Sequence, residues 1–263
     1  MDLELGGSAF IVTGGTDGLG AALAERLVVE GARVAVCGRD VERLRRVEAR
    51  LRDPAFGRGN NGDIIAVRAD VTVPKDLEGL VTATVEHFGR LDGVVNNAGR
   101  SSAGRIDALD DDEWAYDLNS KVMAAVRLIR LALPHLRAAG ARAPVLSTLT
   151  IAPLPAAASL PTTASRAAGL AVTKSLSKEL GPDNIRVNAI MIGLVDSGQW
   201  RRRSEATGRS LDDLYSEMAR GIPLGRVGRS EEFADLAAYL LSRRASYVTG
   251  CAVNLDGGAS PVP

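Results

Sequence analysis

TGGTDGLG, residues 13–20, decides the fold, because it joins the apolar run AFIVT (9–13) to the start of an amphipathic helical pattern. Gly14 permits a tight turn, Gly18 lets the main chain approach a ligand closely, and Gly20 lets helix and strand pack together. The N–H groups at the start of such a helix attract phosphate. A glycine-rich turn between strand and helix therefore predicts a site for the diphosphate of a dinucleotide.

Short β-branched runs alternate with longer helical patterns along the chain. The expected strands are AFIVT (9–13), RVAVC (33–37), DIIAV (63–67), GVVNN (93–97), VLSTL (145–149), RVNAI (186–190) and CAVNL (251–255). The helical patterns cover 19–30, 40–52, 75–88, 111–138, 162–180 and 230–242. Strands that are apolar on both faces are typical of a parallel sheet covered by helices on both sides. We therefore expect residues 1–263 to form a single Rossmann-type α/β domain, with a doubly wound parallel sheet of about seven strands.

Of the two stretches that interrupt this alternation, the longer lies at about 195–228, after the sixth expected strand. It contains a polar run, a short helical pattern at 210–220 and the turn-like sequence PLGRVG (223–228). In an open α/β sheet, loops that follow the carboxyl ends of strands face the ligand crevice. The stretch is therefore predicted to be a substrate lid, with Trp200 closing over the pocket, and a solvated excursion is the alternative.

Composition and charge argue against several classes of protein. Lys plus Arg and Asp plus Glu both total 32, so the formal net charge is zero and no general field attracts nucleic acid or an anionic membrane. The N-terminus MDLELGG lacks the basic start of a signal peptide, and no apolar run approaches the ~18 residues that span a bilayer. Cys37 and Cys251 have no partner at metal-ligand spacing. We expect a cytoplasmic protein with no metal, no nucleic-acid or membrane partner, and two buried reduced thiols.

The form TGxxxGxG, as distinct from GxGxxG, resembles the short-chain dehydrogenase/reductase family, and further matches cover nearly the whole chain. They are Asp70-Val71, NNAG (96–99), Asn119, IRVNAI (185–190), YVTG (247–250) and NLDGG (254–258). The resemblance implies a bound nicotinamide dinucleotide. The residues expected to hold it are Gly14, Thr16, Gly18, Leu19, Gly20, Arg39, Asp70, Val71, Asn97, Ala98, Gly99, Arg166, Gly193 and Val195.

The end of the second expected strand indicates which nicotinamide cofactor is bound. An acid there would hydrogen-bond the ribose 2′-OH and repel a 2′-phosphate, but the strand ends Cys37-Gly38-Arg39. The guanidinium of Arg39 offers a charge-assisted, bidentate partner for a phosphate. Asp40 follows, where it can cap the next helix. NADP is therefore the predicted cofactor and NAD the alternative.

The match to the family fails at the catalytic residues. In the family a Tyr transfers the substrate proton, a Lys four residues later lowers its pKa, and a Ser thirteen before the Tyr orients the carbonyl. The equivalent segment, TTASR, places Thr162 at the Tyr position and Arg166 at the Lys position. Leu149 falls at the Ser position, so Thr150 supplies the hydroxyl if the loop is one residue shorter. Asn119 alone matches the expected tetrad outright.

These substitutions change the chemistry that the site can perform. The hydroxyl of Thr162 can donate a hydrogen bond but is a poor proton source at neutral pH. Arg166 stays protonated and can still hold the nicotinamide ribose or an anionic substrate. The proton must then come from water or from a lid residue, of which Tyr215 is the best candidate.

Three functions fit this pattern. The first is an NADP-dependent oxidoreductase acting on a small carbonyl or alcohol, with Thr150, Thr162 and Arg166 as hydrogen-bond donors. The second is a non-redox enzyme on the same fold, such as an isomerase, dehydratase or cyclase. The third is a non-catalytic module that senses a dinucleotide. The resemblance also implies a homodimer or homotetramer formed through the helices at 111–138 and 162–180.

Overall fold

The computed structural model describes residues 2–53, 62–100, 102, 104–139, 144–150 and 159–261, with the backbone alone for 145–150. Seven parallel strands form one sheet in the order β3-β2-β1-β4-β5-β6-β7. They are β1 (Ala9–Thr13), β2 (Arg33–Gly38), β3 (Asp63–Arg68), β4 (Gly93–Asn96), β5 (Pro144–Thr150), β6 (Arg186–Ile192) and β7 (Ala252–Leu255). The strand order reverses between β1 and β4, which creates the crevice where such sheets bind ligands. The predicted Rossmann-type fold is confirmed.

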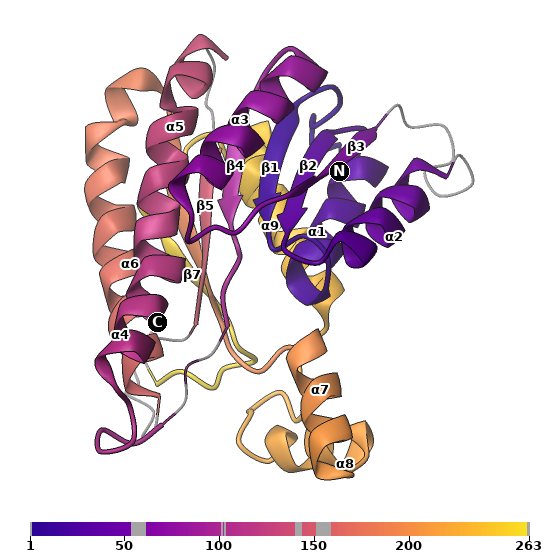
Figure 1. Cartoon of the computed structure of the whole chain (residues 1–263), viewed down its shortest axis with the longest axis vertical. Coiled ribbons are helices and arrows are strands. Elements are labelled where there is room, and N and C mark those ends of the chain that lie inside the picture. Colours follow the sequence, from indigo (N-terminus) through magenta and orange to yellow (C-terminus); the bar gives the residue numbers. More distant parts are fainter. Residues whose placement is uncertain are drawn as a thin grey trace.

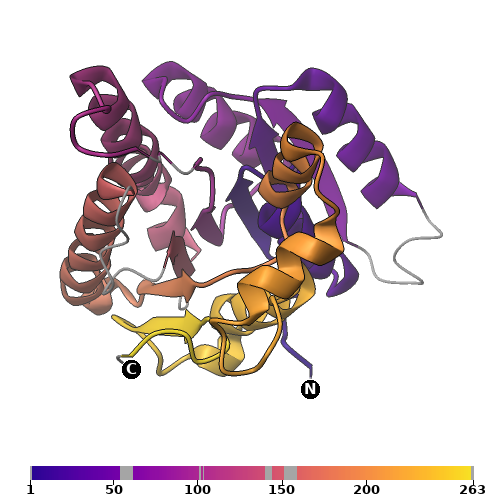
Figure 2. The same ribbon diagram turned by 90° about the horizontal axis from the view of Figure 1, so that it is seen from below.

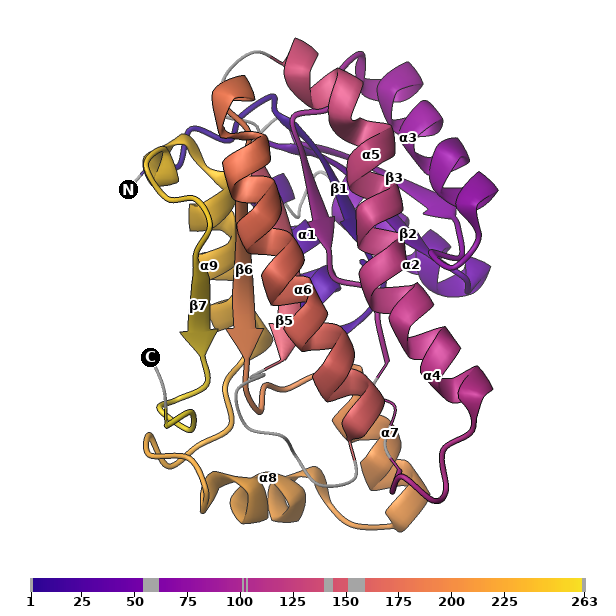
Figure 3. The same cartoon turned by 90° about the vertical axis from the view of Figure 1, so that its left-hand side faces the viewer.

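Helices cover both faces of the sheet (Figure 1). They are α1 (Gly18–Val29), α2 (Val41–Arg52), α3 (Pro74–Phe88), α4 (Asp111–Leu118), α5 (Ala124–Ala138), α6 (Leu160–Glu179), α7 (Gly198–Thr207), α8 (Leu211–Ala219) and α9 (Ser230–Leu241). The apolar sides of α1, α2 and α9 pack on one face, and those of α3, α5 and α6 pack on the other (Figure 3). Between these layers β1 is buried along its whole length, as expected for the centre of a doubly wound sheet.

The helix expected at 111–138 is divided in the structure. α4 and α5 are joined by the π-helical turn η1 (Asn119–Met123). Such turns are rare and occur often at functional sites, because they shift the side chains of one turn relative to their neighbours. The turn carries Asn119, the residue that the sequence singles out on this helix.

The stretch at 195–228 lies beyond the carboxyl ends of the strands. Figure 2, viewed onto this edge of the sheet, shows α7 and α8 crossing in front of it. The helix expected at 210–220 corresponds to α8, but α7 was not expected. It ends at Gly208, whose φ of 67° is a left-handed conformation that stops a helix.

The two cysteines differ from expectation in one respect. Cys37 lies in β2, and burial raises the pKa of its thiol to about 12. Cys251 is exposed at the start of the edge strand β7, so the prediction of two buried thiols is wrong for this residue. Within the described ranges, no group of three His, Cys, Asp or Glu side chains is arranged to hold a metal ion. None of the helices in those ranges has the length and apolar character needed to cross a bilayer.

Candidate active site

The glycine turn between β1 and α1 forms a backbone cradle that side chains would fill. Gly14 and Gly18 have φ values of +66° and +52°, which favour glycine. A Cβ at Gly20 would lie 2.3 Å from the carbonyl oxygen of Gly14, so only glycine fits there. Asp17 caps α1 by accepting a hydrogen bond from the N–H of Gly18 at 2.8 Å. Leu19 packs against the core below the turn.

Hydrogen bonds join this turn to the NNAG segment across the switch point. The side-chain amide of Asn97 donates to the carbonyl oxygens of Thr13 at 2.9 Å and Gly14 at 3.3 Å. The hydroxyl of Thr13 accepts from the N–H groups of Asn97 at 2.9 Å and Ala98 at 3.0 Å. The same hydroxyl donates to Val95 O at 3.2 Å. The carboxyl ends of β1 and β4 are therefore held in one fixed arrangement.

The residues expected at the adenosine end lie together beside β2. The Arg39 guanidinium is mostly exposed and approaches the Asp70 carboxylate at 3.8 Å. Burial works against ionisation of Asp70, but hydrogen bonds from Thr72 and the charge of Arg39 hold its pKa below the ordinary value. Thr16 lies over Gly38, where a Cβ would come within 3.2 Å of the Thr16 methyl group.

A buried polar network joins α4 and η1 to α6. The Lys121 ammonium donates to Asp117 Oδ2 and to Thr162 Oγ1, the latter at 2.9 Å. Ser165 Oγ donates to Asp117 Oδ1 at 2.6 Å, and the N–H of Ser102 donates to Thr162 Oγ1 at 3.0 Å. The Lys121 and Asp117 side chains are 1% and 0% exposed. Two opposite charges are thus held together inside the protein.

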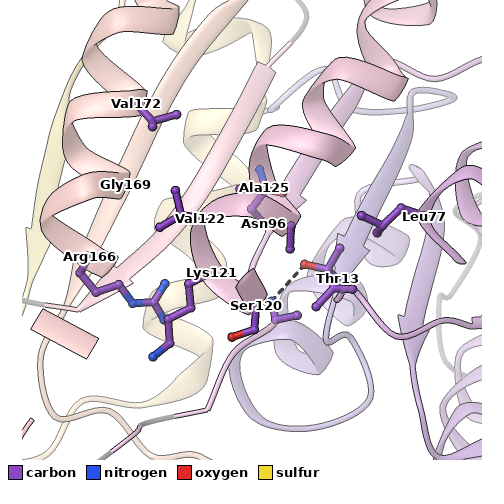
Figure 4. A pocket seen from close by; sticks show the side chains of 13 residues that line it. Thr13, Leu77, Asn96, Ser120, Lys121, Val122, Ala125, Arg166, Gly169 and Val172 are labelled. Carbon is purple, nitrogen blue, oxygen red and sulfur yellow. Dashed lines mark hydrogen bonds between the residues drawn. The ribbon is translucent and has the colours of Figure 1, made fainter. Parts of the chain in front are cut away.

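Lys121 and Arg166 are among the residues that line one narrow cavity at the switch point (Figure 4). Val71 and Ala98 also line it. Both cationic side chains pass close to Gly99, because a Cβ there would lie 3.3 Å from Arg166 Nη2 and 3.6 Å from Lys121 Cε. Arg166 of α6, which the sequence resemblance aligns with the family's Lys, thus lies beside Gly99 of the NNAG segment.

Burial shifts the acidity of both cations. It lowers the pKa of Lys121 to about 8; Asp117 opposes this shift, and the charges of Arg166 and Arg100 add to it. Burial also lowers the pKa of Arg166 to about 10, with Asp117 opposing. Arg166 therefore remains a cation at neutral pH, whereas Lys121 can exchange its proton near neutral pH.

The hydroxyl of Thr162 is fully engaged within the protein. Its oxygen accepts from Lys121 and from the N–H of Ser102. Its proton faces Asp117 Oδ2 at 3.2 Å or Ser102 O at 3.4 Å. A hydroxyl has one donor and two acceptor positions, and all three are used here. Thr162 therefore anchors Lys121 in this arrangement instead of presenting its proton to a ligand.

Lys121 and Asp117 are functional candidates that sequence reasoning missed. Both lie on the helix that carries Asn119, at positions i and i+4 of one face. Lysine is also rare in this chain, which has four, namely Lys75, Lys121, Lys174 and Lys178. A carboxylate followed one helical turn later by a lysine, on either side of Asn119, is the sequence pattern that could have identified this pair.

Asn119 and Thr150, the other two expected catalytic residues, are not part of the network around Lys121 in the described structure. Asn119 Oδ1 accepts from Arg127 Nη1 at 2.5 Å, and its Nδ2 donates to Thr72 O at 3.4 Å. Among the residues whose positions are described, no hydrogen bond joins the Asn119 side chain to Thr162. Thr150 ends β5, where it pairs with Ile192 of β6, and its side chain lies outside the described part of the structure.

The segment after β6 brings further polar groups to the glycine turn. Gly193 donates its N–H to Leu255 O at 2.9 Å, and Val195 forms a bridge with Gly228. A Cβ at Gly18 would lie 3.3 Å from Ser197 Cβ. The hydroxyl oxygen of Ser197 is buried and has no hydrogen-bond partner among the described residues. A ligand at the glycine turn is the natural partner for this hydroxyl.

Tyr215, the residue of the predicted lid that was expected to donate a proton, hydrogen-bonds the carboxylate of Asp196. Its hydroxyl donates to Asp196 Oδ1 at 2.5 Å. Burial and the neighbouring Asp196 raise the pKa of Tyr215 to about 12, which is the wrong direction for a proton donor. Tyr215 instead fastens α8 to the segment that follows β6.

The comparisons with known proteins identify the family of the chain. A family model described as enoyl-(acyl carrier protein) reductase matches residues 14–260. The short-chain reductase protein NovJ of Streptomyces niveus is 32% identical over 251 residues, which cover 95% of this chain and 93% of the relative. The chain belongs to the short-chain dehydrogenase/reductase family.

Solved structures of this short-chain dehydrogenase/reductase family resemble the chain over its whole length. The NADPH-bound short chain oxidoreductase of Pseudomonas aeruginosa PAO1, described as containing an atypical catalytic center, is 34% identical with a TM-score of 0.89, over 97% of this chain and 98% of that one. L-sorbose reductase from Gluconobacter frateurii, complexed with NADPH and L-sorbose, is 30% identical with a TM-score of 0.92, over 100% of both chains. This short-chain dehydrogenase/reductase is thus an enzyme of the oxidoreductase kind.

Proposed function

We propose that this enzyme is an NADP(H)-dependent oxidoreductase that transfers a hydride to or from a small carbonyl or alcohol, with Lys121 as its general acid and base. The observation that carries the proposal is the buried Lys121 side chain, which lines the same cavity as Arg166 and has a pKa of about 8. Thr162 occupies the position of the family's Tyr, and its role here is to hold Lys121.

The residues at the glycine turn fit a dinucleotide. The left-handed backbone at Gly14 and Gly18 and the start of α1 suit a diphosphate, as does the Ser197 hydroxyl, which has no partner among the described residues. The exposed guanidinium of Arg39 suits a 2′-phosphate, which favours NADP over NAD. Two relatives have NADPH bound, which supports the same choice. We assign Arg166 to the nicotinamide ribose.

The remaining assignments follow the arrangement around the crevice. We propose that the rest of the cofactor contacts come from the segments around the glycine turn, β3, β4 and β6. These residues are Thr16, Leu19, Gly20, Asp70, Val71, Asn97, Ala98, Gly99, Gly193 and Val195. Asn119 and Thr150 remain proposed for the substrate side of the site. When bound, the reduced cofactor supplies the hydride.

We propose that Lys121 donates a proton in the reduction and accepts one in the oxidation. In reduction, its ammonium gives a proton to the carbonyl oxygen as the carbonyl carbon receives the hydride, and water then reprotonates the amine. In oxidation, the neutral amine accepts the proton of the alcohol. A pKa of about 8 makes both forms accessible near neutral pH. General acid catalysis of this kind contributes roughly 10²- to 10⁴-fold, or about 3–5 kcal/mol of barrier.

The proposal is tested with wild type, Lys121→Met and Lys178→Met, whose lysine is exposed on α6. Calorimetric titration should show NADPH binding tighter than NADH binding, with little change in either variant. Loss of NADPH absorbance with a panel of small carbonyls should fall by about 10²- to 10⁴-fold in Lys121→Met, because the proton donor is removed. Lys178→Met should retain the wild-type rate.

Two results would contradict separate parts of this proposal. Equal turnover of Lys121→Met and Lys178→Met would exclude Lys121 as the acid. Properly folded wild type that gives no heat with millimolar NADPH or NADH would remove the cofactor, and with it the redox function.

A further inference from the structure

We propose that Asp117 is a positioning residue that holds the Lys121 ammonium in place and balances its charge, with Ser165 fixing the carboxylate. The inference rests on the proposed role of Lys121. It assigns a function to a fully buried charge that the hydride-transfer chemistry itself does not use.

Both oxygens of the Asp117 carboxylate are occupied. Oδ2 faces the Lys121 ammonium and lies 3.2 Å from Thr162 Oγ1. Oδ1 accepts from Ser165 Oγ at 2.6 Å. With one oxygen held from η1 and the other from α6, the carboxylate has no freedom to rotate away from Lys121. A buried carboxylate requires such partners, because leaving it without them is strongly unfavourable.

Ser165 connects this carboxylate to α6. Its hydroxyl has a single proton, which can reach Asp117 Oδ1 at 2.6 Å or Thr162 O at 3.1 Å. The shorter, charge-assisted hydrogen bond to Asp117 is the stronger. Ser165 therefore fixes Asp117 against the same helix that carries Thr162 and Arg166.

The charges around Lys121 show what Asp117 contributes besides position. Arg166 on α6 and Arg100 after β4 both disfavour the ammonium form of Lys121, as burial does. Arg100 is itself paired with Glu113 at 3.1 Å. Asp117 opposes all of these effects, because its carboxylate accepts a hydrogen bond from the ammonium and attracts its charge. Without that carboxylate, burial and the charges of Arg166 and Arg100 would act on Lys121 without this opposition, and Lys121 would lose its proton at lower pH.

The substitution Asp117→Asn removes the negative charge of the side chain and nearly preserves its shape. Asparagine has nearly the same volume, and its amide can still hydrogen-bond Ser165, but it brings no negative charge. Asp183→Asn is the matched control, because Asp183 pairs with Arg137 on the surface and is not among the groups that shift Lys121.

The four lysines make a direct measurement possible. In protein labelled with ¹³C at the lysine ε-carbon, nuclear magnetic resonance follows each signal through a pH titration, and the Lys121→Met variant assigns Lys121. Wild-type Lys121 is expected to titrate near pH 8. Asp117→Asn should lower its pKa by about one to three pH units, as loss of a nearby opposite charge does. Asp183→Asn should leave it unchanged.

A pH profile provides the kinetic counterpart. For carbonyl reduction, which needs the protonated amine, kcat/KM of the wild type should fall above about pH 8. In Asp117→Asn this fall should begin at lower pH, whereas a purely structural role would lower the rate without moving the profile. An unchanged or raised pKa of Lys121 in Asp117→Asn would overturn the proposal.

A measurement on the wild type covers the case in which Asp117→Asn does not fold. An ammonium held by a carboxylate exchanges its protons slowly, so the ¹⁵Nζ–H signal of Lys121 should be visible at neutral pH while those of Lys75, Lys174 and Lys178 are lost to exchange. Absence of a protected signal would overturn the proposal. Both resonance experiments need neither cofactor nor substrate, so their outcome is independent of the test of hydride transfer.

Discussion

Arg186, at the start of β6, binds the carbonyl groups at the end of α9. Its guanidinium is buried and donates to main-chain carbonyl oxygens at the end of α9 and just beyond it. The hydrogen bonds reach Leu240 O at 2.8 Å, Ser242 O at 3.0 Å, and Leu241 O and Val248 O at 3.4 Å. The last carbonyls of a helix lack partners within it and need donors from elsewhere. A cation there also complements the helix dipole.

We expect Arg186→Met to lower the free energy of unfolding by about 2–4 kcal/mol, because it removes these donors and leaves several carbonyls buried without partners. Urea unfolding should show an earlier midpoint with an unchanged slope. Arg243→Met, at a neighbouring exposed position, is the control. If both variants unfold at the same urea concentration, the carbonyl contacts do not stabilise the fold in this way.

Helix α7 is attached to the glycine turn between β1 and α1 by long side chains. Arg201 Nη2 lies 2.7 Å from Asp17 Oδ1, and Arg202 Nη1 lies 3.3 Å from Asp17 Oδ2. The indole N–H of Trp200 donates to Val195 O at 2.9 Å, which fixes the start of the helix. Ion pairs at such exposed positions contribute about 0.2–1 kcal/mol each. Within the lid that we propose at 195–228, we therefore expect α7 to be held weakly.

The double substitution Arg201→Gln with Arg202→Gln should loosen α7 and leave the sheet unchanged. Hydrogen exchange of the amides at 198–207 should become several-fold faster, because local opening gains about 1 kcal/mol. High salt should produce part of the same effect in the wild type by screening these pairs. Arg203→Gln is the control, since no ion pair joins Arg203 to Asp17 among the described residues. Equal exchange in the double variant and this control would show that Asp17 does not hold α7.

The sequence predicts the strands of the sheet better than it predicts α7, because burial leaves an apolar pattern in the strands. A strand buried on both faces must be apolar throughout, so the apolar runs at β1 and in the middle of β2 are visible without a structure. Helix α7, GQWRRRSEAT, has no apolar stripe to indicate its period. Its position depends on contacts with distant residues such as Asp17, which no local pattern contains.

One part of the candidate site can likewise be predicted from the sequence, and another part cannot. The glycine turn is predictable because its backbone geometry requires glycine at particular positions. The partnership of Lys121 with Thr162 is not, because the two residues are 41 positions apart and meet only when η1 packs on α6. Thr162 was expected to donate to a substrate. Its saturated hydrogen bonds depend on Ser102 and Asp117, which local sequence does not relate to it.

At the scale of the whole molecule, the outer side of α4 and η1 presents apolar side chains to solvent. Leu118 and Met123 are 39% and 42% exposed, and they flank the turn that carries Lys121. The sequence resemblance already predicts a homodimer or homotetramer through the helices at 111–138 and 162–180. We propose that these two side chains contribute to that contact, since their burial between subunits would be favourable.

Size-exclusion chromatography with light scattering should then give two or four times the mass of one chain. Leu118→Glu combined with Met123→Glu should shift the protein toward the monomer, because a subunit contact would bury both new charges. Val41→Glu is the matched control, since Val41 on α2 is 41% exposed but lies outside the predicted contact. A strictly monomeric wild type would contradict the assembly, and equal dissociation by Val41→Glu would contradict its location.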